Sequence, residues 1–365
     1  MKRNTDFDIM INIIEKEWET RMSKNILESK WEIPLYSKSQ INKAGKIISS
    51  PGSSIPDEQE ALNILNNWRS AHAYPLQVIA SNLRRNNKNA IVVQRLKRLD
   101  SIAGKLKRFP DMSLYRMQDL GGCRVIVDSV DEVYKTLNKY KNSRIRHILK
   151  REDDYIQNPK KSGYRSYHIV YQFQSDEKET YNKNMLIEIQ FRTKLQHIWA
   201  TAVEMMGIYT KSNLKSGIGS EDILRFFALV SSIFAIMEGS PIIPSTIDNY
   251  DILISEIKKI ESSNHMLETL NLITLAINIK NNSEEKYSYY LLVQDYNDAS
   301  LNVFSFTKRQ IRKAIDYYNA LEESNMPHIN AVLVSASSFD SLKTAYPNYF
   351  ADISEFVTMM RRILA

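Results

Sequence analysis

The stretch Asp-Leu-Gly-Gly-Cys-Arg-Val-Ile-Val at residues 119–127 decides the fold, because it joins a turn to a buried strand. Its second part, residues 123–127, is short, apolar and β-branched, which predicts an interior strand. Asp119 stands at the start of this strand, and two glycines allow a close approach of the backbone. A carboxylate at a strand end is well placed to hold Mg²⁺. For Asp119 alone, a turn or capping role is the alternative.

A second strand carries a line of polar side chains. Residues 187–193 read Ile-Glu-Ile-Gln-Phe-Arg-Thr, so a period of two places Glu188, Gln190 and Arg192 on one face. Polar groups on a buried sheet face need partners. If this strand lies beside Asp119, Glu188 completes a metal site of two carboxylates. The alternative is a solvent-facing side of an antiparallel sheet.

The wider pattern predicts an α+β fold with a mixed β-sheet flanked by helices. Strands are expected at residues 123–127, 144–150, 167–173 and 185–191, and helices at 7–22, 57–74, 76–108, 130–142, 194–209 and 221–238. Asp57 is expected to cap the helix that it begins. Helical patterning at 249–279 is followed by a second strand–strand–helix–strand pattern with two short helices near the end, which predicts a smaller C-terminal α/β domain.

Turn-forming residues at 50–56 and 239–245 predict the domain boundaries. We therefore expect an N-terminal helical segment at 1–50, a central domain at 51–240 and a C-terminal α/β domain at 241–365. The aromatic cluster Tyr346-Pro-Asn-Tyr349-Phe350 is either a contact surface of this last domain or part of its core.

Composition excludes several classes of protein. The chain has 365 residues and one cysteine, which excludes a disulfide framework and a cysteine zinc site. No run approaches 18 apolar residues, and the N-terminus does not resemble a signal peptide, so a cytoplasmic protein without a membrane span is expected. Residues 1–240 carry a net charge of +11 and residues 241–365 a net charge of −4. The basic part favours an anionic partner, either nucleotide phosphate or nucleic acid.

Two more clusters suit a nucleotide. The cations at 95–108 could grip a polyphosphate, although a solvated helix face is the alternative; they are Arg95, Lys97, Arg98, Lys105, Lys107 and Arg108. The loop at 153–168 brings Tyr164 among Lys160 and Lys161, which suits a stacked base with phosphates nearby. The alternative is an ordinary loop entering a strand, with His168 as a structural residue.

In this order, the clusters resemble the synthetase domain of the RelA/SpoT family over roughly residues 58–240. The family pattern R-x-K-x7-K is matched by Arg95, Lys97 and Lys105, and D-x-x-G-x-R by Asp119, Gly122 and Arg124. The loop pattern D-Y-I-x-x-P-K-x-x-G-Y-x-S-x-H is matched from Asp154 to His168. The strand pattern E-x-Q-x-R-T is matched at residues 188–193.

The resemblance implies a magnesium-dependent pyrophosphokinase that transfers the β,γ-pyrophosphate of ATP to the 3′-hydroxyl of GDP or GTP, makes the alarmone (p)ppGpp and releases AMP. It implies that Asp119 and Glu188 bind Mg²⁺ and are the catalytic residues. ATP would be held by Arg95, Lys97, Lys105 and Arg124. The acceptor would be held by Tyr164, Lys160, His168 and Gln190, and Glu188 could also act as general base.

Departures from the family leave alternatives open. Asp153 stands where the family often has a cation, which bears on the preference between GDP and GTP. No His-Asp dipeptide occurs, so we expect synthesis without the family's hydrolase activity. One alternative is a toxic relative from a toxin–antitoxin or phage-defence system that modifies the tRNA 3′ end or adenine nucleotides. Another is a degenerate nucleotide sensor. We further expect a homo-oligomer or intramolecular regulation by residues 241–365.

Overall fold

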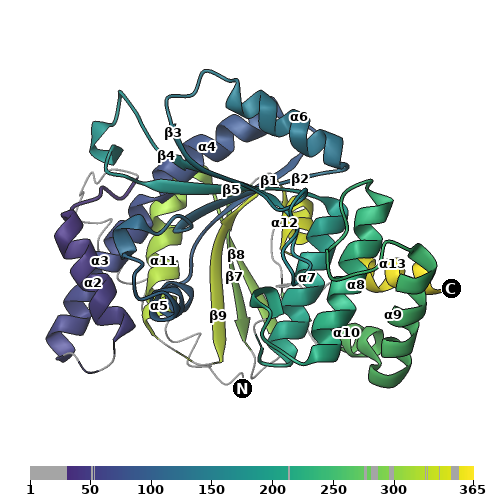
Figure 1. The fold of residues 1–365 in the computed structure, drawn as a ribbon. Helices are drawn as coiled ribbons and strands as arrows, with labels where there is room; N and C mark the ends of the chain where they lie inside the picture. Colours follow the sequence, from purple (N-terminus) through teal and green to yellow (C-terminus); the bar gives the residue numbers. More distant parts are fainter. Residues whose placement is uncertain are drawn as a thin grey trace.

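The computed structural model describes residues 31–50, 52, 54–212, 214–274, 278–280, 287–295, 300–324, 326, 328–336, 338–346 and 353–365 (Figure 1). Its helices are α2 (Lys38–Ser49), α3 (Ile55–Ala71), α4 (Ala73–Asn86), α5 (Leu99–Arg108), α6 (Val130–Lys141), α7 (Lys194–Tyr209), α8 (Glu221–Met237), α9 (Tyr250–Asn264), α10 (Met266–Thr274), α11 (Ile311–Glu323), α12 (Phe339–Ala345) and α13 (Ser354–Leu364). Short 3₁₀ turns occur at Leu114–Arg116, Glu179–Tyr181, Leu214–Ser216 and Lys308–Gln310. No helix in these ranges is both long and apolar enough to cross a bilayer.

Nine strands form one mixed sheet in the order β3-β4-β5-β2-β1-β9-β7-β8-β6. They are β1 (Ile91–Leu96), β2 (Gly121–Val127), β3 (Ile148–Asp154), β4 (Tyr167–Gln172), β5 (Leu186–Thr193), β6 (Asn278–Lys280), β7 (Tyr289–Asp295), β8 (Ser300–Phe306) and β9 (Ile329–Ser335). The pairs β2–β5 and β6–β8 are parallel, and the other neighbours are antiparallel. The predicted α+β class with a mixed sheet is confirmed.

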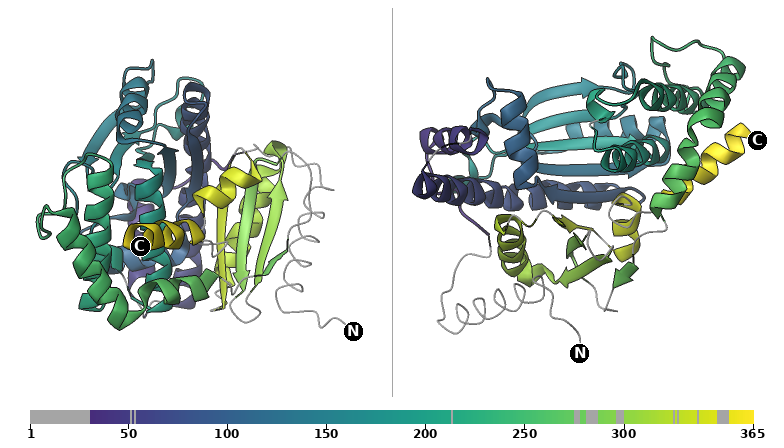
Figure 2. Two further views of the ribbon diagram at one scale, coloured as in Figure 1. Left: turned by 90° about the vertical axis from the view of Figure 1, so that its right-hand side faces the viewer. Right: turned by 90° about the horizontal axis from the view of Figure 1, so that it is seen from below.

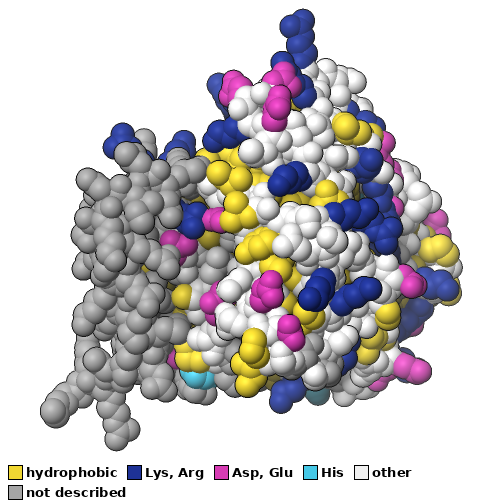
Figure 3. All heavy atoms as spheres, turned by 90° about the vertical axis from the view of Figure 1, so that its left-hand side faces the viewer, with side chains coloured by type: hydrophobic (Ala, Val, Ile, Leu, Met, Phe, Trp, Pro, Cys, Tyr) yellow, Lys and Arg dark blue, Asp and Glu magenta, His cyan; other side chains and the backbone are white. Residues whose placement is uncertain are grey.

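Helices lie on both faces of the central strands β2 and β5. In Figure 1, α4 and α6 lie above β1, β2 and β5, and α7 lies below them. The apolar side chains of β2 that face α4 and α6, such as Val125, belong to a large core with Leu76 and Leu137. On the other side of the sheet, β2 and β5 carry polar side chains, some of which line the pocket described below. Seen from the side of α2 and α3, Lys and Arg side chains are interspersed with acidic and hydrophobic ones (Figure 3).

Three expectations about local structure need correction. The helix expected over 76–108 is interrupted, since α4 ends at Asn86, β1 occupies 91–96 and α5 begins at Leu99. Pairing of β1 with two distant strands outweighs the helical pattern of its sequence. Helix α3 is capped by Ser54, whose Oγ accepts from the backbone N–H of Asp57 at 3.3 Å, so Asp57 is not its cap. The strand expected at 144–150 lies at 148–154, and the helix expected at 7–22 falls outside the described residues.

The sheet and the cores continue across the boundary expected at 239–245. Strand β9 pairs with β1 through Gln94–Ser335 and Arg95–Val334, and the strands β7 to β9 form a layer beside the rest of the molecule (Figure 2). A second core joins α7 and α8 to α13, with Phe234 against Phe356 at 6.3 Å between ring centroids. The division of the chain into domains therefore stays a prediction, and residues after 240 contribute buried side chains to every core cluster.

Candidate functional site

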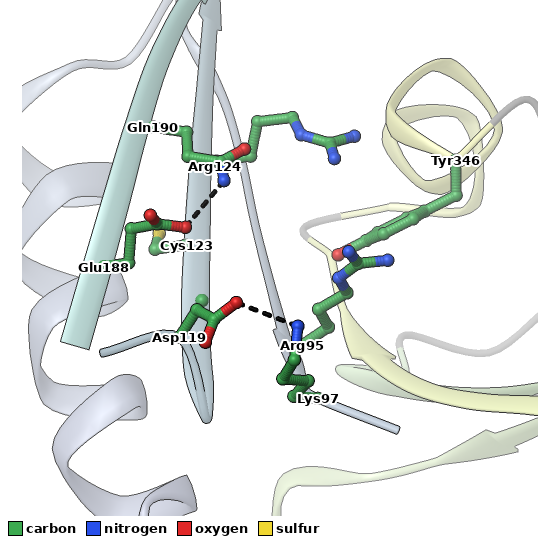
Figure 4. Close-up of a pocket in the computed structure, with 9 residues that line it drawn as sticks. Arg95, Lys97, Asp119, Cys123, Arg124, Glu188, Gln190 and Tyr346 are labelled. Atoms are coloured by element: carbon green, nitrogen blue, oxygen red, sulfur yellow. Dashed lines mark hydrogen bonds and ion pairs between the residues drawn. The ribbon is translucent and has the colours of Figure 1, made fainter. Parts of the chain in front are cut away.

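A pocket of about 450 Å³, including its open mouth, lies on the polar side of β1, β2 and β5 (Figure 4). It is lined by Arg95, Lys97, Asp119, Gly122, Cys123, Arg124, Glu188, Gln190 and Tyr346. The parallel register of β2 and β5 sets Gly122 opposite Glu188 and Arg124 opposite Gln190. The structure thus brings together both predicted catalytic acids, three of the four predicted ATP-binding cations and one predicted acceptor residue.

Asp119 is held by two lysines at the entrance to β2. Lys97 Nζ lies 2.8 Å from Asp119 Oδ2, and Lys105 Nζ lies 2.9 Å from Oδ1, which brings Lys105 to the pocket from α5. Burial opposes ionisation of Asp119, but the two ammonium groups outweigh it and lower the pKa of this carboxyl. Burial also lowers the pKa of Lys97. Asp119 is therefore an ionised carboxylate that is already arranged among cations.

Glu188 is the second carboxylate, and each of its two oxygens has a hydrogen-bond partner. His168 Nδ1 lies 3.2 Å from Glu188 Oε1, and Gln190 Nε2 donates to Oε2 at 2.7 Å. Burial opposes ionisation, yet the bonds from His168 and Gln190 lower the pKa of Glu188 to about 2. The pKa of His168 is raised to about 9, because Tyr164 and Glu188 outweigh the effect of burial. Near neutral pH the pair is an imidazolium beside a carboxylate.

Tyr164 is buried, with 7% of its surface exposed. Its hydroxyl lies 2.8 Å from His168 Nε2 and accepts from Arg192 Nη2 at 2.6 Å. Burial alone would raise the pKa of this phenol, but Arg192 and His168 lower it to about 7. Gly163 precedes it with φ +93°, and a Cβ there would meet Trp199 at 2.7 Å, so only glycine permits this turn.

Cations already lie against the ring that was predicted to stack on the acceptor base. The ammonium of Lys160 lies 5.2 Å from the Tyr164 ring centroid and 4.4 Å from that of Tyr155. The Arg192 guanidinium lies 5.1 Å from the Tyr164 centroid. In this arrangement Tyr164 links Lys160, His168 and Arg192 through its ring and its hydroxyl. A base could stack on it only after some of these neighbours move.

The C-terminal part of the chain closes one wall of the pocket. Tyr346 follows α12 and reaches towards the side chains of Arg95 and Arg124 in Figure 4. Its ring centroid lies 5.8 Å from the Arg124 guanidinium carbon, and Arg124 Nη1 donates to the carbonyl of Ala345 at 3.0 Å. His197 Nε2 lies 2.8 Å from the carbonyl of Thr344. Ala345 and Tyr346 therefore contact Arg124, a predicted ATP-binding residue, and Thr344 contacts His197.

Sequence reasoning did not place Arg192 or Tyr346 in the site. Arg192 shared the polar face of β5 with Glu188, so its period-two spacing was the available signal. Nothing local in the sequence marks Tyr346 as a pocket residue, because its partners lie more than two hundred residues earlier. Tyr349 and Phe350 of the same aromatic cluster fall outside the described residues.

Positive charge is in excess around the pocket. Burial, and then the nearby Arg192 and Arg95, lower the pKa of Arg124 to about 10. Burial, Arg124 and Arg192 also lower the pKa of His197 well below its usual value. Repulsion among buried cations is relieved when an anion binds between them. The electrostatics therefore suit a polyphosphate.

A divalent cation would find two carboxylates here. Among the described residues no group of three or more His, Cys, Asp or Glu side chains forms a metal cluster. Asp119 and Glu188 nevertheless line one pocket, and each carboxylate has lone pairs beyond those used by its present partners. Mg²⁺ commonly uses one or two carboxylates together with substrate phosphates. The residues fit a metal that arrives with a nucleotide.

Asp153, the acid at the position where a cation was expected, is neutralised locally. Arg151 Nε lies 2.7 Å from Asp153 Oδ2, and this contact raises the pKa of Arg151. The two residues lie on β3, with Asp153 opposite His168 on β4. The negative charge of Asp153 is thus paired with Arg151 on the same strand.

Residues 94–214 match the family described as "Region found in RelA / SpoT proteins". The chain is similar to the GTP pyrophosphokinase YjbM of Bacillus subtilis (strain 168), with 33% identity over 127 residues, which cover 34% of this chain and 58% of the relative. It is also similar to the GTP pyrophosphokinase YwaC of the same organism, with 32% identity over 126 residues, covering 33% and 57%. The chain thus spans a little over half the length of these relatives.

Among solved structures, a GTP pyrophosphokinase family protein from Streptococcus pneumoniae is 27% identical, with a TM-score of 0.40, over 46% of this chain and 86% of that one. The small alarmone synthetase 1 from Bacillus subtilis, bound to its product pppGpp, is 23% identical, with a TM-score of 0.41, over 46% and 89%.

Proposed function

Because the chain contains a RelA/SpoT region at residues 94–214, we propose that it is an ATP-dependent pyrophosphokinase that acts on GDP or GTP. The similarity to two GTP pyrophosphokinases supports this assignment. The observation that carries it is the placement of Asp119 and Glu188 in one pocket with Lys97 and Arg124. We further propose that the chain synthesises alarmone and does not degrade it.

In the proposed reaction, the 3′-oxygen of the acceptor attacks the β-phosphorus of ATP. A new oxygen–phosphorus bond forms as the bond to the α,β-bridging oxygen breaks, so AMP leaves and the hydroxyl proton is lost. Such transfer depends mainly on positioning and on neutralisation of charge. Arg95, Lys97, Lys105 and Arg124 would bind the donor. When bound at Asp119 and Glu188, Mg²⁺ would supply further charge neutralisation at the phosphate oxygens.

The low pKa of Glu188, about 2, bears on its role. A carboxylate of such low basicity is a weak proton acceptor near neutral pH. It is a good ligand and a good anchor for His168, which lies 3.2 Å away. We therefore propose that Glu188 binds the metal and positions His168. The proton of the acceptor hydroxyl would then pass to solvent or to a substrate phosphate.

The acceptor is proposed to enter on the side of His168, Gln190 and Lys160. These residues lie on β4, on β5 and in the loop before β4, and Tyr164 joins them through His168 and Lys160. Because Tyr164 is buried among cations, we propose that it mainly organises this side through its hydroxyl.

We also propose that residues 344–346 regulate donor binding. Tyr346 lies against Arg124, a residue assigned to ATP, and the Ala345 carbonyl occupies one of its N–H donors. A planar ring against the Arg124 guanidinium resembles the way in which such a group holds an aromatic base. The segment would have to move before ATP occupies this end of the pocket.

The test is a transfer assay with γ-labelled ATP and, in separate reactions, GDP, GTP, ADP, ATP and deacylated tRNA. Labelled (p)ppGpp with GDP or GTP is the expected product, in the full-length chain or in its Tyr346→Ala variant. Asp119→Asn and Glu188→Gln should each lower the rate about a thousandfold or more while remaining folded, since a lost metal ligand costs several kcal/mol in the transition state.

Other outcomes would overturn parts of the proposal. Label on tRNA or on an adenine nucleotide would show that this molecule is the acceptor, and pyrophosphate transfer would remain the reaction. No transfer to any acceptor by either protein would refute the pyrophosphokinase. Near-normal rates in Asp119→Asn or Glu188→Gln would refute the site of two carboxylates.

A further inference from the structure

The junction between β1 and α5 carries most of the proposed donor site. Its cations are Arg95, Lys97 and Lys105. Residues from the C-terminal part of the chain hold this junction at several points. Val334 of β9 pairs with Arg95, and Asn330 of β9 accepts a hydrogen bond from Arg98. The orientation of the donor cations thus depends on residues far along the chain.

The N-terminus of α5 is capped from α11. The residue at its N-cap position, Arg98, makes no side-chain capping bond to the helix, and the first N–H groups of a helix have no partner within the helix. Glu322 Oε2 accepts from the Leu99 N–H at 2.6 Å. A carboxylate at this end also interacts favourably with the helix dipole. We propose that Glu322 is a positioning residue, which caps α5 and thereby fixes Lys105 against Asp119.

Glu322 is itself held in place, as such a role requires. Arg69 Nη1 lies 3.2 Å from the same Oε2 atom, and the Arg69 side chain is completely buried while that of Glu322 is 10% exposed. Arg69 Nη2 also donates to Asn319 Oδ1 at 2.6 Å, and its guanidinium carbon lies 4.7 Å from the Tyr318 ring centroid. One carboxylate oxygen therefore joins α3, α5 and α11.

Glu322 influences the pocket through α5, which carries Lys105. Lys105 lies in the last turn of this ten-residue helix, and its Nζ reaches Asp119 Oδ1 at 2.9 Å. If the first turn loosens, the direction of Lys105 is less well defined, although every pocket residue remains present. The loss should therefore appear in donor binding.

The test compares Glu322→Ala with Glu322→Gln. Both variants leave the buried Arg69 without its charged partner, so both should lower the melting temperature. Only Gln keeps an oxygen that can accept from Leu99. Loss of a helix cap lowers the equilibrium constant for the folded helix by roughly five- to thirtyfold. We expect Glu322→Ala to raise the KM for ATP by about that factor with little change in kcat, and to speed amide exchange at residues 99–102. Glu322→Gln should stay within about threefold in KM.

Glu323→Ala is the matched control, because Glu323 is the next residue on α11 and its carboxylate accepts a hydrogen bond from Asn66 on α3. It should change neither the KM nor the exchange at 99–102. Equal KM changes in Ala and Gln, or a similar change in Glu323→Ala, would overturn the proposal. The KM readout rests on the proposed function, whereas amide exchange does not. If the wild-type chain transfers pyrophosphate to no acceptor, exchange at 99–102 still decides the cap.

Discussion

Replacing Tyr346 by alanine should make ATP bind more tightly. The side chain is almost fully buried, at 3% exposure, and it lines the pocket beside Arg124. If its ring must leave before the donor enters, the apparent affinity is reduced by the fraction of molecules that are open. Removing the ring removes that reduction.

The size of the effect follows from the contact that the ring makes. A cation–π contact in a desolvated site is worth up to about 2 kcal/mol. The Arg124 bond to the Ala345 carbonyl involves backbone, so it survives the substitution. Since each 1.4 kcal/mol is a factor of ten, 2 kcal/mol corresponds to roughly thirtyfold. The KM for ATP should therefore fall by about ten- to thirtyfold.

The assay is initial rate against ATP concentration at saturating acceptor, with a direct titration by a methylene-bridged ATP analogue. Tyr346→Phe is the control, because it keeps the ring and should stay near wild type. Thermal melting of all three proteins checks that the small core around Tyr346 survives. A KM that rises in Tyr346→Ala would show that the ring helps to bind ATP, and would refute the regulatory role of this segment.

Two further predictions follow from buried polar groups. Tyr164→Phe should lower the transfer rate at least tenfold, nearly as much as Tyr164→Ala, because the lost hydroxyl leaves the buried Arg192 and His168 short of a partner; a mild Phe variant would instead favour base stacking. The second concerns His72 in the core, whose pKa burial lowers from 6.5 to about 4. Its contribution to stability is present above pH 6.5 and is lost as the pH falls through 4. Between pH 6.5 and pH 4, the free energy of unfolding measured in urea should therefore fall by about 3 kcal/mol less in His72→Gln than in the wild type. Parallel curves for the two proteins would contradict this.

The sequence predicted the parts of the site that are local. The apolar run of β2 and the alternation of β5 were sufficient to mark Asp119 and Glu188 as candidates; the parallel pairing that sets Glu188 opposite Gly122 comes from the structure. The helix Lys194–Tyr209 was expected with the same bounds as α7. In each of these elements, local pattern and tertiary environment agree.

The remainder depends on contacts that no local pattern contains. β1 was expected to be helical, as part of the helical pattern over 76–108. Pairing with β2 and β9 and a bond from Gln94 to Gln77 make it a strand. The burial of Tyr164 depends on how its loop packs against α7 and α8. The entry of Tyr346 into the pocket likewise depends on tertiary packing alone.

The pairing of β1 with β9 also imposes an order on folding while the chain is being translated. Leu96, where β1 ends, and Ile329, where β9 begins, are separated by more than two hundred residues. Contacts of such long sequence separation form late, and a chain leaves the ribosome from its N-terminal end. While the C-terminal part is still being translated, β1 lacks one neighbour, Arg69 lacks Glu322, and Tyr346 cannot reach Arg124. The nascent chain would therefore carry both carboxylates of the pocket before it carries the tyrosine that covers the donor end.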